Sequence, residues 1–156
     1  MAAADPGQVV GGFRLAATDG RTVSLWQYKQ RRPVVLVLWA NGGDHLLAGF
    51  AERYADYRRL GAEVLAIGPA PPDRDLPFPV LLDSDGATAA SLADERPAVL
   101  VLDSFGELFT RRQGASAARP DHDDLLEWVF FTEVQCEECG PHAENWPRRD
   151  PGDAGG

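Results

Sequence analysis

The chain has 156 residues, of which 44% are hydrophobic and 25% are charged, a composition that suits one globular domain with its own core. Its formal net charge of -9 disfavours nucleic acid and anionic membrane surfaces as partners, because both are negatively charged themselves. The amino terminus has no signal-peptide pattern, and the longest apolar run, 34–40, is too short to cross a bilayer. We therefore expect a cytoplasmic protein that binds neither nucleic acid nor membrane.

The amino-terminal part is expected to begin without fixed structure and then to form a hairpin. Residues 1–8 are small and polar, which predicts disorder. Two short extended runs, Phe13–Ala17 and Thr22–Leu25, flank an Asp-Gly turn, which is typical of a β-hairpin. The folded domain is predicted to span residues 9–135 and to be followed by a separate carboxyl-terminal segment, 136–156.

The most informative stretch is an apolar run that leads directly into an amphipathic helix. Val34–Trp39 is continuously apolar and rich in β-branched residues at its start, which predicts a central strand buried on both faces. Apolar residues then recur at helical spacing over 44–60, with Asp44 as the expected N-cap and Gly61 as the residue that ends the helix.

The turn between this strand and this helix is the predicted place for function. In α/β proteins, ligands bind where a strand's carboxyl end meets a helix amino terminus, because free N–H groups and the helix dipole point there. In this chain the turn holds Asn41, Gly43, Asp44 and His45. His45 beside Asp44 is a candidate proton carrier, although a solvated first-turn histidine is the simpler interpretation, because no nucleophile or metal ligand is near it in sequence.

Further elements follow in an α/β order. Glu63–Gly68 predicts a second buried strand, parallel to the first because a helix separates the two. The proline-rich stretch 69–79 is expected to be a loop. After it, Val80–Asp83 predicts a short strand, and Ser84–Ala93 predicts a short helix.

The last part of the domain should contain an antiparallel strand pair and a long helix. Residues 98–102 and 107–112 surround an Asp-Ser-Phe-Gly turn. The helix is expected over 120–135, with Asp121 as its cap and His122 exposed in its first turn. Its apolar face is broader than one side of a sheet usually covers, so we expect it to pack also on the carboxyl-terminal segment or on a second subunit, as in a homodimer.

Together these elements resemble the thioredoxin superfamily, in particular its peroxiredoxin (AhpC/TSA) and TlpA-like redoxin branch, over about residues 7–135. The Leu-Trp-Ala sequence at the end of the 34–39 strand carries the resemblance, together with a hairpin pattern and a Pro-x-x-x-x-x-Asp-x-x-Gly pattern. The matching positions are Phe13, Leu15, Gly20, Val23, Ser24, Leu25, Tyr28, Pro97, Asp103 and Gly106. The resemblance implies an α/β thioredoxin-like fold, with a central mixed sheet flanked by helices, and thiol-redox or antioxidant work.

The resemblance also makes specific statements about the site. It implies a cis bond before Pro97, facing the 41–45 turn, and we expect the 98–102 strand to be a second parallel neighbour of the central strand. By the same register, the two cysteine positions of a thioredoxin-type Cys-x-x-Cys correspond to Gly43 and Leu46. Because no cysteine lies between residues 40 and 60, we predict that the protein has no peroxiredoxin-type peroxidase activity.

The chain's two cysteines, Cys136 and Cys139, form the one reactive cluster in the sequence. Three interpretations remain open: a slow redox dithiol, a zinc site completed by His142, and inert thiols. A helix carboxyl terminus and the intervening glutamates disfavour a thiolate. If the cysteines are functional, we expect the segment that carries them to fold back on the domain, with Trp146 packed on the long helix.

Two functions therefore remain after the sequence has been analysed. One is an atypical thiol-disulfide oxidoreductase that uses Cys136 and Cys139 and is recharged by a thiol reductant. The other is a non-catalytic binding or scaffold domain that holds a protein partner and has kept the fold without its chemistry. No organic cofactor is expected in either case, and zinc is the alternative for the second.

Overall fold

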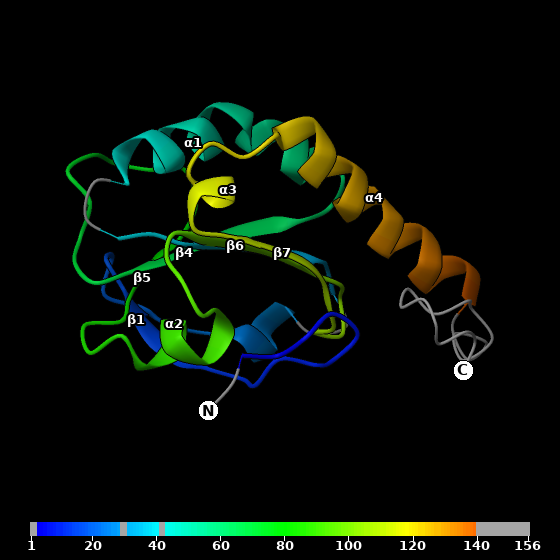
Figure 1. Cartoon of the computed structure of the whole chain (residues 1–156), viewed down its shortest axis with the longest axis horizontal. Helices are drawn as coiled ribbons and strands as arrows, with labels where there is room; N and C mark the ends of the chain where they lie inside the picture. The colour runs from blue at the N-terminus through cyan, green and yellow to red at the C-terminus, as the bar shows by residue number, and fades with distance from the viewer. Residues whose placement is uncertain (1–2, 29–30, 41–42, 140–156) are drawn as a thin grey trace.

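The computed structural model describes residues 3–28, 31–40 and 43–139, the last five of them as backbone only. A seven-stranded mixed sheet in the order β2-β1-β5-β4-β3-β6-β7 forms the middle layer. Helices α1, α3 and α4 cover one face of this sheet, and α2 lies with the short 3-10 helix η1 on the other (Figure 1). The predicted α/β class and thioredoxin-like architecture are confirmed.

The described elements follow the predicted order. The strands are β1 (Arg14–Ala17), β2 (Thr22–Ser24), β3 (Val34–Leu38), β4 (Glu63–Gly68), β5 (Val80–Leu82), β6 (Ala98–Leu102) and β7 (Leu108–Gln113). The helices are η1 (Leu25–Tyr28), α1 (Asp44–Arg59), α2 (Ala87–Leu92), α3 (Ala115–Ala118) and α4 (His122–Cys139). The one-turn helix α3 has no counterpart in the prediction, because a single turn leaves no periodic pattern in the sequence.

The central strand β3 divides the core into two halves. Its five residues are all buried, as its continuous apolar run predicts. Leu36 packs on one face with Leu92 of α2, whereas Val37 packs on the other face with Phe50 of α1 and Val129 of α4. Alternate side chains of a strand point to opposite faces, so one apolar run supports both layers of helices.

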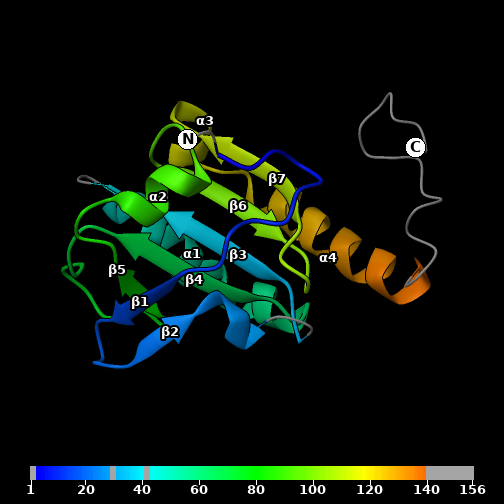
Figure 2. The same ribbon diagram turned by 90° about the horizontal axis from the view of Figure 1, so that it is seen from below.

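The neighbours of β3 differ in direction, which corrects one expectation. β4 is parallel to β3, as predicted, but β6 is antiparallel to it, with Val34 opposite Leu102 and Leu38 opposite Ala98. Figure 2 shows the strands side by side. The strand itself was placed correctly beside β3. Its direction depends on the path of the chain between β5 and β6, which the apolar pattern of the strand does not record.

The amino-terminal segment is ordered where it is described, which corrects the predicted disorder of residues 1–8. The Gly7 N–H donates to the carbonyl of Leu108 over 2.8 Å, and the Leu108 N–H donates to the carbonyl of Gln8 over 2.9 Å. The guanidinium of Arg111 donates to the carbonyl of Ala4, and Ala3 is buried. These bonds attach the segment to β7, and a composition of small residues does not reveal such a partner.

Candidate functional site

The predicted site lies at the carboxyl end of β3, where the chain enters α1. An open hollow of about 250 Å³ lies there. Its lining residues are Ala40, Gly43, His45, Leu46, Pro97, Ala118 and Arg119. The Arg96–Pro97 peptide bond is cis, as predicted, and Pro97 lines the same hollow as Gly43 and His45. Asn41, the other predicted residue of this turn, lies outside the described residues.

The two positions that the resemblance matches to redoxin cysteines hold a glycine in close backbone contact and a buried leucine. A Cβ atom on Gly43 would lie 2.9 Å from the carbonyl oxygen of Ala40 and 3.2 Å from Cβ of Trp39. The close backbone contact therefore requires glycine, because a backbone oxygen cannot move away as a flexible side chain can. Leu46 is 3% exposed and belongs to the core on this face of the sheet.

The first turn of α1 is built from backbone rather than from a side-chain cap. Gly43 is the N-cap residue and makes no side-chain hydrogen bond, while its carbonyl accepts the N–H of Leu47 over 3.1 Å. Asp44, which was expected to be the cap, is instead the first residue of the helix. Its negative carboxylate there interacts favourably with the positive end of the helix dipole. Both Asp44 and His45 are exposed, which agrees with the simpler interpretation of His45.

A second hollow of about 190 Å³ adjoins the first, and His122, which was expected to be exposed, lines it. His122 is half-buried, because its ring packs edge-on against Phe50 with centroids 4.6 Å apart. Its Nδ1 lies 2.9 Å from the hydroxyl of Tyr57. Burial lowers the pKa of His122, and the nearby guanidinium of Arg53 lowers it further. The only sequence signal for this contact was the helical spacing of Phe50 and Tyr57, which predicts that both face inward. That spacing does not identify His122 on another helix as their partner.

The cysteine pair lies far from this site. α4 begins at His122 and extends over 18 residues to Cys139, so Cys136 and Cys139 occupy its last turn. At 1.5 Å per residue, the two positions are about 21 and 25 Å along the helix from His122. Figure 1 shows this half of α4 leading away from the sheet. The predicted end of the helix at residue 135 is therefore corrected, and His142 and Trp146 lie outside the described residues.

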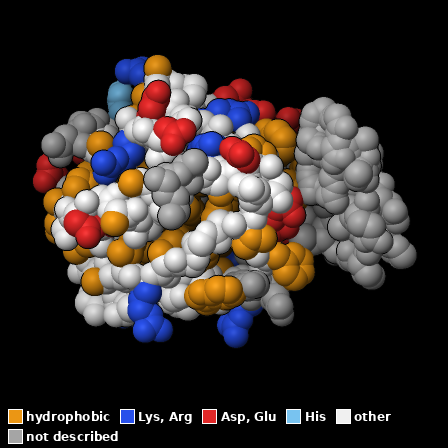
Figure 3. All heavy atoms as spheres, turned by 60° about the horizontal axis from the view of Figure 1, so that its bottom comes forward, with side chains coloured by type: hydrophobic (Ala, Val, Ile, Leu, Met, Phe, Trp, Pro, Cys, Tyr) orange, Lys and Arg blue, Asp and Glu red, His pale blue; other side chains and the backbone are white. Residues whose placement is uncertain are grey.

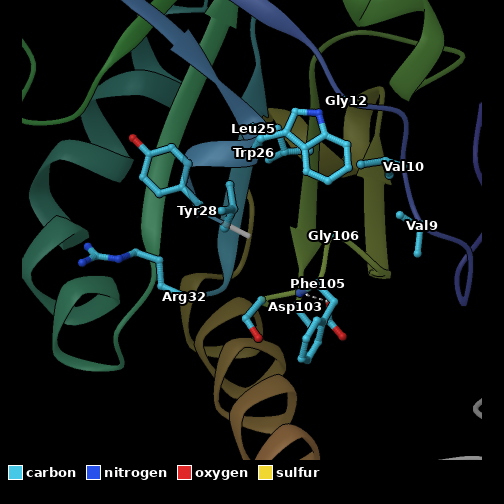
Figure 4. Close-up of a pocket in the computed structure, with 12 residues that line it drawn as sticks. Val9, Val10, Gly12, Leu25, Trp26, Tyr28, Arg32, Asp103, Phe105 and Gly106 are labelled. Carbon is cyan, nitrogen blue, oxygen red and sulfur yellow. Dashed lines mark hydrogen bonds between the residues drawn. The ribbon is translucent and has the colours of Figure 1, made fainter. Parts of the chain in front are cut away.

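A different pocket lies at the opposite end of the sheet and was not predicted. Val9, Trp26 and Phe105 line it, and each of them is at least 47% exposed. The Trp26 indole lies close against Gly12, where a Cβ atom would be 2.5 Å from its Nε1. The Tyr28 hydroxyl and the Arg32 guanidinium point away from the middle of the pocket (Figure 4). With the lower side of Figure 1 turned toward the viewer, apolar side chains are visible at several places on the surface (Figure 3).

Neither a metal-binding cluster nor a membrane-spanning helix is found in the part of the chain that is described. Its residues contain no group of three or more His, Cys, Asp or Glu side chains arranged to hold a metal ion. Among the same residues, no helix is both long enough and apolar enough to cross a membrane.

The fold and the cis-proline turn define a thioredoxin-like redoxin domain. The sequence model of the AhpC/TSA family matches residues 6–110, well over half of the chain. The chain belongs to the AhpC/TSA family. A search of curated proteins found no match.

Solved structures support the same fold at low sequence identity. Peroxidoxin BcpB from Mycobacterium tuberculosis is similar at 18% identity and a TM-score of 0.70, over 80% of this chain and 95% of that one. The reduced 2-Cys peroxiredoxin of Plasmodium vivax gives 14% identity and a TM-score of 0.72 over 88% of each chain. A candidate thiol:disulfide interchange protein DsbE from Chlorobium tepidum gives 18% identity and a TM-score of 0.64, over 80% of this chain and 98% of that one.

Proposed function

We propose that this AhpC/TSA-family protein is a thiol-disulfide oxidoreductase that uses Cys136 and Cys139 as its dithiol and has no peroxiredoxin-type peroxidase activity. The spacing of the two cysteines carries the proposal. They are the chain's only cysteines and stand three residues apart in one helical turn. Residues at this spacing are neighbours on a helix surface, with Cβ atoms about 5–6 Å apart, so that a small local change brings them to disulfide distance.

The proposed reaction moves two electrons from the dithiol to a disulfide substrate. The thiolate of one cysteine attacks a substrate sulfur, forms a mixed disulfide, and releases the other substrate sulfur as a thiolate that takes up a proton. The second cysteine, after losing its own proton, attacks the mixed disulfide, releases the remaining substrate thiol and closes the Cys136–Cys139 disulfide. A thiol reductant then returns the pair to the dithiol form.

The surroundings of the pair predict slow chemistry. A helix carboxyl terminus carries partial negative charge, and Glu137 and Glu138 stand between the cysteines. Negative charge favours the protonated thiol, whereas the thiolate is the nucleophile. We therefore expect reduction of disulfides at rates well below those of redoxins whose cysteine lies at a helix amino terminus.

The test is a redox titration of the full chain with glutathione buffers, read by the mass change of a thiol reagent. A reversible two-electron transition in the range of cytosolic oxidoreductases, lost in Cys136→Ser and in Cys139→Ser, is the expected result. Hydrogen peroxide turnover well above that of free cysteine, abolished by Cys136→Ser, would contradict the absence of peroxidase activity. Thiols that react at once and never pair would refute the dithiol.

The second candidate is a non-catalytic binding domain, and a separate observation favours it. The cis-proline hollow has stayed open although a glycine and a buried leucine occupy its two cysteine positions. An open hollow without a nucleophile suits recognition rather than catalysis. In this candidate, Cys136, Cys139 and His142 form a structural zinc site or are inert, and metal analysis of the purified protein separates the two.

A further inference from the structure

The two hollows described above form one groove, which we call the α1–α4 groove. It extends from Pro97 at one end to His122 at the other, between α1 and the segment that joins α3 to α4. The residues that line both hollows are His45, Leu46, Ala118 and Arg119. The groove is open along one side, which suits a segment of extended chain better than an enclosed small molecule.

The lining of the groove contains one arginine and no acidic side chain, although the protein as a whole is acidic. The chain has 24 acidic and 15 basic residues, yet no Asp or Glu side chain lines either hollow. Arg119 is exposed and makes no ion pair with any described residue. The nearby arginines behave differently, because Arg53 pairs with Asp123 and Arg112 pairs with Asp124, each over 2.8 Å. Arg119 is therefore available for a partner from outside.

The geometry of His122 directs a hydrogen-bond donor toward the same groove. Tyr57 is buried, and its hydroxyl forms a hydrogen bond with Nδ1 of His122 over 2.9 Å. With the Tyr57 hydroxyl as the donor, Nδ1 is the acceptor and the ring proton is assigned to Nε2. Nε2 lies beside Gly49, 3.2 Å from the place of a Cβ atom there, and both residues line the groove.

We propose that the α1–α4 groove binds an extended peptide segment that carries a carboxylate side chain. The carboxylate is held between Arg119 and His122, and the apolar residues that flank it in the peptide lie on Leu46 and Pro97. An arginine offers two parallel N–H donors to a carboxylate, and the neutral imidazole adds a third without further charge. One arginine in a strongly acidic protein suits a singly charged carboxylate better than a phosphate, which proteins usually hold with several basic residues.

This inference rests on the second candidate function, the binding domain, and not on the cysteines. The double variant Cys136→Ser/Cys139→Ser should therefore bind the peptide as the natural chain does. Failure of the redox titration leaves the groove untouched, and failure of the peptide experiment leaves the dithiol untouched.

The experiment is a titration of the ¹⁵N-labelled full chain, followed by NMR, with the pentapeptide Ala-Leu-Glu-Leu-Ala, acetylated and amidated so that it carries one carboxylate. Saturable shifts at the backbone amides of Leu46 and Arg119 are expected. The matched peptide with Gln in place of Glu should bind at least tenfold more weakly. Arg119→Gln should weaken binding of the Glu peptide at least tenfold, whereas Arg14→Gln, which removes an exposed arginine of β1, should leave it unchanged.

A second variant tests the histidine without removing it. Gly49→Ala places a methyl group against Nε2 of His122 and replaces a helix-interior glycine by the best helix former, so the fold should be kept. We expect weaker binding of the Glu peptide and little change for the Gln peptide. Equal binding of the two peptides, equal losses in Arg119→Gln and Arg14→Gln, or no saturable shift at millimolar peptide would overturn the proposal.

Discussion

The two ends of α4 differ in what surrounds them. At the amino-terminal end, His122 packs against α1, and Leu125 and Val129 are at most 1% exposed. Phe130, the residue that follows Val129, lies on another side of the helix and is 57% exposed, and the helix continues past the sheet to the cysteines. In a redoxin with cysteines after the Trp-Ala turn, the reactive sulfur and the cis-proline hollow share one place. Here the hollow lies at one end of α4 and the thiols at the other, so that binding and redox chemistry can be disturbed separately.

The largest expected effect on stability comes from comparing a phenylalanine that packs on the amino-terminal end of α4 with one that is exposed on α4 itself. Phe50→Ala should lower the free energy of unfolding by about 3–5 kcal/mol, because it leaves a cavity in a closed part of the core. Phe50 is fully buried against Tyr57 and His122. Phe130→Ala removes the same side chain from an exposed position and should cost less than about 1 kcal/mol. Urea unfolding measures both.

A comparable loss in Phe130→Ala would contradict this comparison. It would indicate that the exposed face of α4 around Phe130 is covered in solution, either by the carboxyl-terminal segment or by a second subunit, as its broad apolar pattern suggests. Dependence of the Phe130→Ala loss on protein concentration would identify a second subunit, because dissociation contributes to the unfolding free energy of a dimer.

Moving a thiol from one end to the other gives the next largest effect. Leu46→Cys, in the Cys136→Ser/Cys139→Ser background, places a thiol in the first turn of α1 beside Arg119, where the helix dipole favours a thiolate. We expect it to react with iodoacetamide at pH 7 at least tenfold faster than Cys136 does in the natural chain. The control is Leu47→Cys, because Leu47 is the next residue in the same turn and is buried like Leu46, but lines neither hollow. A thiol at position 46 that reacts no faster than Cys136 would show that this turn does not activate sulfur.

The smallest effect is a pH dependence at the amino-terminal end. Burial holds the pKa of His122 below its ordinary value of 6.5, so the unfolded chain binds the proton more tightly than the folded one. The stability that this group contributes is present above pH 6.5 and is lost as the pH falls through its lowered pKa. In His122→Gln, which keeps an acceptor for Tyr57, this part of the pH dependence should disappear. Urea midpoints between pH 5 and 8 test it, and an unchanged profile would mean that His122 is not the titrating group.

The sequence by itself determined the local elements and the family. The apolar run 34–38, the helical spacing after Asp44, the Asp-Gly hairpin and the Pro97 register each depend on residues close together in the chain, and the structure reproduces all of them. The absence of cysteine from the first turn of α1 is likewise a fact of sequence. Interactions along a strand or helix have a fixed period, and a period can be recognised without knowing the partner.

Tertiary structure alone decided which distant groups meet. The antiparallel direction of β6, the attachment of residues 3–8 to β7 and the contact of His122 with Tyr57 all join segments whose sequences carry no sign of each other. The extension of α4 to Cys139 is also a result of tertiary structure, and it places the two cysteine positions about 21–25 Å along the helix from His122. Partners at long sequence separation are selected by packing and by the need of buried polar groups for hydrogen bonds, and both depend on the whole fold.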